Sequence, residues 1–169
     1  MAIEDPKAKD VFGTIATTGR DALADLDRML DVLQGNAQRS PLPGLADLES
    51  LCTSVRSTGL DVDLSLPADA KAISPSVGLS IYRIVQEALT NVIKHARATS
   101  VSVVVGVDDT GRAVSVSVRD NGSGGQTVPG RGLGGIAARA ALHGGSVHYG
   151  PAADRGFELA VRLTSGAAP

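Results

Sequence analysis

Hydrophobic and polar positions repeat along this chain with two periods, and these periods predict the order of its elements. A spacing of three to four residues predicts helices over residues 7–33, 45–58, 75–98 and 132–143. Alternation of apolar and polar residues predicts strands over 60–67, 101–107, 113–120, 146–150 and 157–163. The sequence Asp-Asp-Thr-Gly-Arg between the second and third of these strands indicates a hairpin turn.

The order of these elements predicts the fold class. Helices lie between hairpins rather than between single strands, which favours a mixed, mostly antiparallel sheet with helices on one face. The expected architecture is an α/β two-layer sandwich preceded by one long N-terminal helix. We predict three regions: the long helix within 1–36, a linker over 37–44 rich in Gly, Pro and Ser, and a domain over 45–165.

The N-terminal helix carries a heptad pattern. Ile15, Ala22 and Met29 recur every seven residues, and so do Leu26 and Leu33. An apolar stripe of this kind needs a partner surface. Two interpretations stay open: the helix packs on its own domain, or it forms a bundle with a second copy of the chain, and we favour the homodimer.

The composition limits the function classes. The chain has 169 residues, 43% hydrophobic and 20% charged, with a net charge of −2 and no Trp, so its core should be aliphatic. The sequence has no basic block with interleaved aromatic residues, the pattern that is typical of nucleic-acid binding. No apolar run approaches the roughly 20 residues of a membrane span, so a cytoplasmic location is expected, although a longer protein could be membrane-anchored. Cys52 is the single cysteine and should be a small buried hydrophobe.

The helix over 75–98 holds the first candidate site. Glu87, Asn91 and Lys94 fall at i, i+4 and i+7 and form one polar stripe. The opposite, apolar face comprises Val85, Ala88, Leu89, Val92, Ile93 and Ala96. This arrangement suggests a magnesium-phosphate site, in which Asn91 supplies an oxygen to Mg²⁺ and Glu87 orients or deprotonates the attacking group. Lys94 and His95 could donate to phosphate oxygens. Taken alone, Glu87 and Lys94 could instead form an ion pair on a solvated helix face, and Asn91 could be an exposed polar residue.

A second candidate site follows the strand over 113–120. The sequence D-N-G-S-G-G, residues 120–125, begins where this strand ends. An ionised Asp120 only accepts hydrogen bonds, so it could accept from the exocyclic amine of adenine and reject guanine. Gly122 and Gly124 would let the backbone approach the flat base. The alternative for this motif alone is an ordinary Asn-Gly turn.

The third candidate site is the glycine-rich stretch of residues 129–135, which precedes the last helix. Its glycines indicate a flap followed by free N–H groups at a helix start, where phosphate binds well. Gly130, Gly132 and Gly135 also match the dinucleotide pattern G-x-G-x-x-G. We reject that assignment, because no strand runs directly into Gly130 and a hairpin is predicted to follow the helix.

These three motifs together resemble a known family. Residues 83–96 look like the asparagine box of bacterial sensor histidine kinases, and residues 120–125 and 130–136 look like their two glycine boxes. The resemblance is strongest to the subgroup of nitrate and membrane-fluidity sensors. It covers residues 45–163 as the ATP-binding catalytic domain, with the GHKL or Bergerat fold that gyrase and the MutL ATPases share. Residues 7–33 resemble the second helix of the dimerisation and phosphotransfer domain.

The resemblance implies a role for each candidate. Asn91 would be the Mg²⁺ ligand, Glu87 the catalytic residue, Lys94 and His95 phosphate contacts, and Asp120 the adenine anchor. The nucleotide site would further include Gly122, Gly124, Gly130, Gly132, Leu133 and Gly135. The implied function is transfer of the γ-phosphoryl group of ATP to a histidine, for relay to a response regulator with a helix-turn-helix output domain.

The chain also departs from the family pattern. Its three histidines, His95, His143 and His148, all lie within the predicted ATP domain. The phospho-accepting helix is therefore expected from a missing segment or another chain, and this chain alone should not autophosphorylate. Ala138 stands where the subgroup usually has Glu, although Arg139 remains. Two alternatives stay open: a serine kinase of the anti-sigma-factor type, and a non-enzymatic, dimeric ATP-gated interaction module.

Overall fold

The computed structural model describes residues 42–69, 73–123 and 131–164, with only the backbone of residue 131. The chain divides into two compact units, 1–41 and 42–169, and every described residue belongs to the second. The predicted long helix over 7–33 lies outside the described residues. That helix, a dimer formed through it, and the predicted domain limits therefore stay predictions.

The centre of the described unit is a five-stranded sheet. In spatial order its strands are β1 (Asp61–Ser65), β2 (Ser100–Val107), β3 (Ala113–Asp120), β5 (Phe157–Thr164) and β4 (Ser146–Pro151). β1 runs parallel to β2, and the other three neighbouring pairs are antiparallel. The predicted mixed, mostly antiparallel sheet is confirmed, as is the hairpin of β2 and β3.

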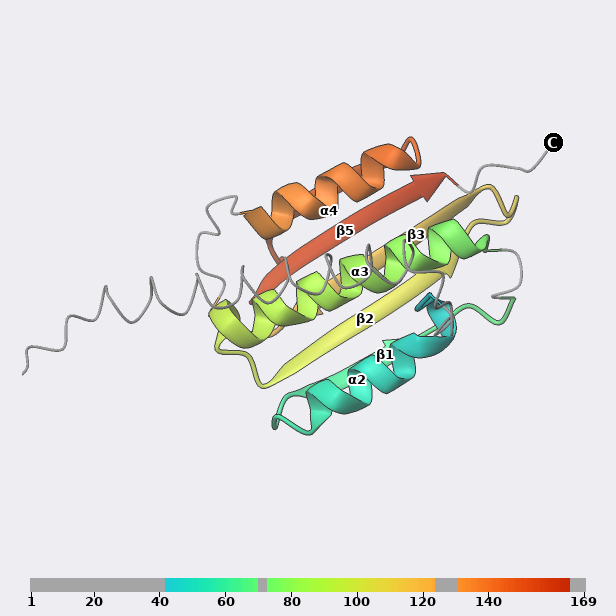
Figure 1. Ribbon diagram of the computed structural model, residues 1–169. Coiled ribbons are helices and arrows are strands. Elements are labelled where there is room, and N and C mark those ends of the chain that lie inside the picture. The colour runs from blue at the N-terminus through green and yellow to red at the C-terminus, as the bar shows by residue number, and fades with distance from the viewer. Residues whose placement is uncertain (1–41, 70–72, 124–130, 165–169) are drawn as a thin grey trace, which may run out of the picture. The chain divides into compact units, whose positions relative to one another are not determined.

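The helices lie together over one face of this sheet (Figure 1). They are the short 3-10 turn η1 (Leu45–Asp47), α2 (Leu48–Arg56), α3 (Pro75–Asn91) and α4 (Arg131–Leu142). The central helix, α3, covers the middle of the sheet, and the opposite face of the sheet carries no helix of the described residues (Figure 1). The predicted two-layer sandwich is confirmed. None of the helices in the described residues has the length and apolar character needed to cross a membrane.

An aliphatic core fills the space between the two layers. Alternation along β2 and β3 turns every second side chain, mostly valine, toward the helices, where it meets the apolar face of α3. Fully buried members include Leu48, Ile81, Ile84, Val103, Val116, Ile136 and Leu163. Each such side chain contributes about 1.5–3 kcal/mol relative to an exposed one. Cys52 is buried among them as predicted, and this burial raises the pKa of its thiol.

Helix α3 starts at a capping residue and ends where the helix type changes. At its start, the Ser74 hydroxyl accepts a hydrogen bond from the Val77 N–H at 3.4 Å and Pro75 occupies the first turn, as the sequence predicts. At its end, α3 passes into a π-helical turn, η3 (Val92–Ala96), which stops at Arg97 with φ 50°. The wider turn rotates the residues after Asn91. Ile93, predicted on the apolar face, is therefore 51% exposed, and that prediction was wrong.

The turn between β2 and β3 is organised by Asp108. Its Oδ1 accepts from the N–H groups of Arg112 and Ala113, at 2.9 and 3.1 Å, and from the Thr110 hydroxyl at 3.0 Å. These bonds, led by that from Ala113, lower the pKa of the Asp108 carboxyl.

We expect this pKa shift to make stability depend on pH. Because the folded-state pKa lies below the unfolded value of about 4, the stabilisation by Asp108 is complete above that value and is lost as the pH falls through the folded pKa. In urea unfolding at pH 6, the parent should have a larger free energy of unfolding than Asp108→Asn. At pH 3 this difference should be smaller. Asp109→Asn, at the exposed neighbouring residue, is the control. An equal difference between the parent and Asp108→Asn at both pH values would contradict this account.

Candidate functional site

Glu87 and Asn91 lie on consecutive turns near the end of α3, half-buried, where the start of α4 packs over them. Gly132 makes this close approach possible. A Cβ at this position would lie 2.1 Å from Glu87 Oε1 and 3.4 Å from Asn91 Nδ2. The structure therefore brings the carboxylate and carboxamide of the predicted polar stripe together with the helix start that follows the last glycine-rich stretch.

Asp120 is the last residue of β3, and its side chain is only 5% exposed. Within the described part of the chain it is the one buried charged side chain. Alternation turns Asp120 toward the helix layer, whereas its neighbour Arg119 points to the open face of the sheet. The Asp120 Oδ1 accepts from the Gly122 N–H at 2.7 Å. A carboxylate has about four acceptor sites, so capacity remains for a donor from a ligand.

The turn formed by residues 120–122, called the D-N-G turn below, rests on the end of η3. A Cβ at Gly122 would lie 2.1 Å from the carbonyl oxygen of Ala96, and the Ser123 N–H donates to the same oxygen at 3.0 Å. We predicted glycine here because of the approach of a base. In the structure the space beside Gly122 is filled by protein backbone, so packing against Ala96 already requires glycine.

Asn121 ties the D-N-G turn to the start of β2. Its Oδ1 accepts from the N–H groups of Thr99 and Ser100, at 2.9 and 3.0 Å. Its Nδ2 donates to the Thr99 hydroxyl at 2.9 Å. Our sequence interpretation gave Asn121 no role beyond a turn, because its partners lie more than twenty residues earlier in the chain.

The remaining candidates lie in different surroundings. Lys94 and His95 are exposed on η3. Leu133 is 6% exposed and belongs to the hydrophobic core, so a direct contact with a nucleotide stays a prediction. Gly135 lies one turn before Arg139, whose Nη1 donates to the Gly135 carbonyl at 3.1 Å. Gly124 and Gly130 lie outside the described residues.

Residues 76–166 match the family described as "Histidine kinase-, DNA gyrase B-, and HSP90-like ATPase". The chain belongs to this ATPase family. The match begins in α3 and extends just past β5, so it contains Glu87, Asn91 and Asp120. The predicted fold family is thereby confirmed.

Individual relatives agree with the family assignment. The chain is 30% identical over 158 residues to the sensor histidine kinase LnrJ of Bacillus subtilis (strain 168), covering 92% of this chain and 38% of LnrJ. It is 29% identical over 159 residues to the sensor histidine kinase YxjM of the same organism, with the same coverage. The ATP binding domain of PrrB from Mycobacterium tuberculosis has a similar structure, with 26% identity, a TM-score of 0.53, and coverage of 73% of this chain and 94% of that one.

The match to these relatives covers only part of their length. The chain spans 38% of the length of LnrJ and of YxjM. The predicted resemblance to sensor histidine kinases is confirmed, whereas the narrower subgroup stays a prediction.

A Mg²⁺ ion bound with a nucleotide here would have few protein ligands. Across the described residues, no group of three or more His, Cys, Asp and Glu side chains could hold a metal ion alone. Mg²⁺ is commonly held by one or two protein oxygens together with phosphates and water. The oxygens of Asn91 and Glu87, one helical turn apart, fit a cation shared with a nucleotide.

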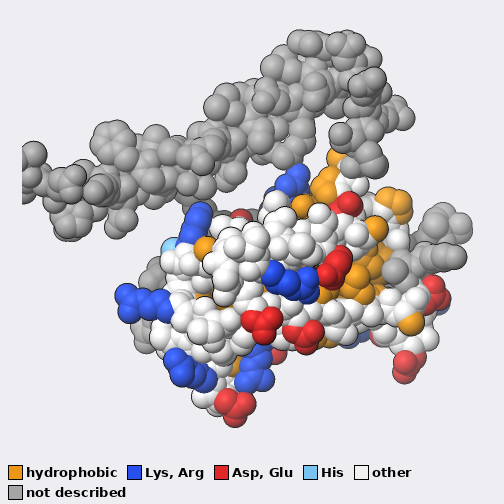
Figure 2. All heavy atoms as spheres, turned by 90° about the horizontal axis from the view of Figure 1, so that it is seen from below, with side chains coloured by type: hydrophobic (Ala, Val, Ile, Leu, Met, Phe, Trp, Pro, Cys, Tyr) orange, Lys and Arg blue, Asp and Glu red, His pale blue; other side chains and the backbone are white. Residues whose placement is uncertain are grey.

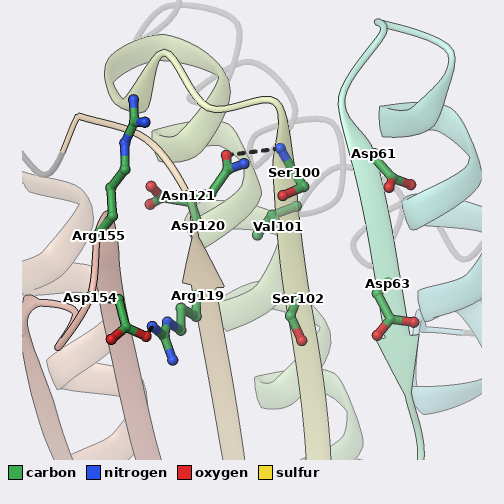
Figure 3. Close-up of a pocket in the computed structure, with 10 residues that line it drawn as sticks. All are labelled: Asp61, Asp63, Ser100, Val101, Ser102, Arg119, Asp120, Asn121, Asp154 and Arg155. Atoms are coloured by element: carbon green, nitrogen blue, oxygen red, sulfur yellow. Dashed lines mark hydrogen bonds and ion pairs between the residues drawn. The ribbon is translucent and has the colours of Figure 1, made fainter.

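A separate pocket lies on the open face of the sheet (Figure 3). Asp61, Asp63 and Arg119 line it, and Asp120 and Asn121 lie at one end. The helices lie behind the strands in this view. Most of the pocket therefore lies across the sheet from the α3 side chains, and it shares Asp120 with the candidate nucleotide site. On another face, shown in Figure 2, basic and acidic side chains of the described residues are interspersed.

Proposed function

We propose that the described unit is the ATP-binding catalytic domain of a sensor histidine kinase. It would transfer the γ-phosphoryl group of ATP to a histidine on a separate segment or chain. The observation that carries this proposal is the close packing of Gly132 on Glu87 and Asn91, within the stretch that matches the ATPase family.

Adenine recognition is assigned to Asp120. Its buried carboxylate is fixed on one side by the Gly122 N–H and can accept the exocyclic amine of adenine with its remaining capacity. Guanine carries a carbonyl oxygen at the same place, so this acceptor would face the Asp120 carboxylate, which is also an acceptor. Gly122 and Gly124 would border the base, with Gly124 assigned from the resemblance alone.

The phosphate end is assigned to the two helix termini that meet there. Asn91 would give its amide oxygen to Mg²⁺, which when bound neutralises charge on the phosphates. Lys94 and His95 would donate to phosphate oxygens. The start of α4, with Gly132, Leu133 and Gly135, would offer backbone N–H groups to the phosphates, and Gly130 is assigned to the same site from the resemblance alone.

Glu87 is assigned the catalytic role. Its carboxylate would accept a hydrogen bond from the incoming imidazole and orient the attacking nitrogen toward the γ-phosphorus. Such positioning, with charge neutralisation, is most of what a phosphoryl-transfer enzyme contributes. The partner of the transfer would be a phospho-accepting helix. The relay would then pass to a response regulator with a helix-turn-helix output domain, and the segment before residue 42 would supply a dimer contact.

We expect Glu87→Gln to separate chemistry from binding. With labelled ATP and a separate histidine-bearing helix pair, the parent should yield acid-labile label. Glu87→Gln should lower the rate about 100- to 10,000-fold while leaving ATP affinity nearly unchanged, because the amide keeps the shape but loses the base. Glu158→Gln, at a residue on β5, is the matched control.

Other outcomes of this assay distinguish the competing functions. Acid-stable label on a serine-bearing partner would indicate a serine kinase. A parent that binds ATP but labels no supplied histidine would indicate an ATP-gated interaction module, and it would contradict the enzymatic proposal.

A further inference from the structure

The turn between β4 and β5, residues 152–156, packs directly on the D-N-G turn. Gly156 has φ +93°, and a Cβ there would lie 1.8 Å from the carbonyl oxygen of Asp120 and 3.1 Å from the Asn121 Cα. This turn is closed by the Ala152 N–H, which donates to the Gly156 carbonyl at 3.0 Å. Two turns that are more than thirty residues apart in sequence therefore share one packed contact.

A side chain adds a polar contact between the same two turns. The Arg155 Nε donates to the Gly122 carbonyl at 3.1 Å in a partly buried hydrogen bond, while the Arg155 residue as a whole is exposed. In Figure 3 the Arg155 side chain rises beside Asp120 and Asn121. A guanidinium donor makes this bond charge-assisted, so it is stronger than a bond between neutral groups.

Gly122 is consequently held from three directions. Its N–H donates to Asp120, its carbonyl accepts from Arg155, and its missing Cβ faces the Ala96 carbonyl. The Gly122 N–H is the donor that fixes the Asp120 carboxylate. A displacement of Gly122 would therefore move the group that is assigned to adenine recognition.

The neighbouring ion pair does not serve the same purpose. Arg119 Nη2 lies 3.0 Å from Asp154 Oδ2, but the two side chains are 43% and 90% exposed. Exposed pairs of this kind contribute little to stability. Arg155 is thus the side chain of the β4–β5 turn that acts on the D-N-G turn.

We propose that Arg155 is a positioning residue for the nucleotide base. It holds the Gly122 carbonyl and, through Gly122, sets the Asp120 carboxylate in the orientation that distinguishes adenine from guanine. Arg155 itself touches no reacting atom. This inference rests on the proposed ATP-binding function, and it adds a residue that lies outside the three motifs recognised in the sequence.

The test measures nucleotide affinity and amide exchange in the same variants. For Arg155→Ala we expect the Kd for MgATP to rise about tenfold, as for loss of a hydrogen bond to a charged group, with little change for MgGTP. The preference for ATP over GTP should fall by the same factor. Hydrogen exchange at the Gly122 and Ser123 amides should accelerate in the variant without nucleotide. Arg155→Lys should recover part of both properties, and Arg112→Ala, at an exposed arginine of the β2–β3 turn, should match the parent.

Two results would overturn the inference while leaving the proposed function intact. One is an unchanged affinity for both MgATP and MgGTP in Arg155→Ala when the parent binds ATP. The other is an equal loss of ATP and GTP affinity, which would place the effect on the phosphates or on the fold. A parent that binds no ATP would instead refute the proposed function, and the positioning role would fall with it.

Discussion

Asp120→Asn should remove most of the protection of the fold by ATP. The asparagine can keep its oxygen on the Gly122 N–H, so the D-N-G turn should persist. Its NH₂ group would then face the adenine amine, donor against donor, in a buried site. Loss of a hydrogen bond to a charged group with a donor left unpaired costs about 3 kcal/mol, so ATP affinity should fall about 100-fold or more.

Thermal unfolding with and without nucleotide measures this protection by ATP directly. A nucleotide at 100 times its Kd stabilises the native state by about 2.7 kcal/mol, which raises the parent Tm clearly. At the same MgATP concentration, a 100-fold weaker affinity leaves a stabilisation of about 0.4 kcal/mol or less. We therefore expect at most a small rise in Asp120→Asn and a normal rise in Asp109→Asn, an exposed aspartate of the β2–β3 turn. An ATP-dependent rise in Asp120→Asn equal to that of the parent would contradict the assignment of Asp120 to the base.

Gly156→Ala should be the most destabilising single change in the β4–β5 turn. The new Cβ would meet the Asp120 carbonyl oxygen at 1.8 Å, and an alanine would also have to adopt φ +93°. Overpacking against backbone costs about 1–3 kcal/mol, and the left-handed conformation costs about 1–2 kcal/mol more. The free energy of unfolding should therefore fall by about 2–5 kcal/mol, a large part of the stability of an ordinary domain.

Gly111→Ala is the matched control for this prediction. Gly111 also lies in a hairpin turn and has φ +68°, but nothing lies within 4 Å of the position of a Cβ. Its substitution should cost only the backbone contribution, about 1–2 kcal/mol. In urea unfolding, the losses of the two variants should differ by the overpacking cost, about 1–3 kcal/mol. Equal losses would show that the β4–β5 turn does not pack on the D-N-G turn as described.

Local sequence patterns predicted the elements that carry the candidate site. The period of residues 75–98, with Ser74 and Pro75 at the start, predicted α3, and alternation predicted the hairpin that ends at Asp120. These features depend on neighbours within a few residues, so the sequence around them contains the information. The contact of Gly132 with Glu87 and Asn91 could be expected only when the motifs were considered together.

Features that depend on distant contacts were not predictable in the same way. The π-helical turn at Val92–Ala96 has no simple sequence signal, so Ile93 was placed on the wrong face. The partners of Asn121 and of Arg155 lie more than twenty residues away in sequence. Neither residue type nor spacing indicates such hydrogen bonds before the strands are paired.

The central claim is that α3, the D-N-G turn and the start of α4 form one nucleotide site. The most direct test is a backbone amide NMR titration with Mg²⁺ and a non-hydrolysable ATP analogue. We expect the largest shift changes at Asn91, Gly122 and Gly132, saturating together with a single Kd. An unchanged spectrum, or changes confined to Asp61, Asp63 and Ser102 on the open face of the sheet, would contradict it.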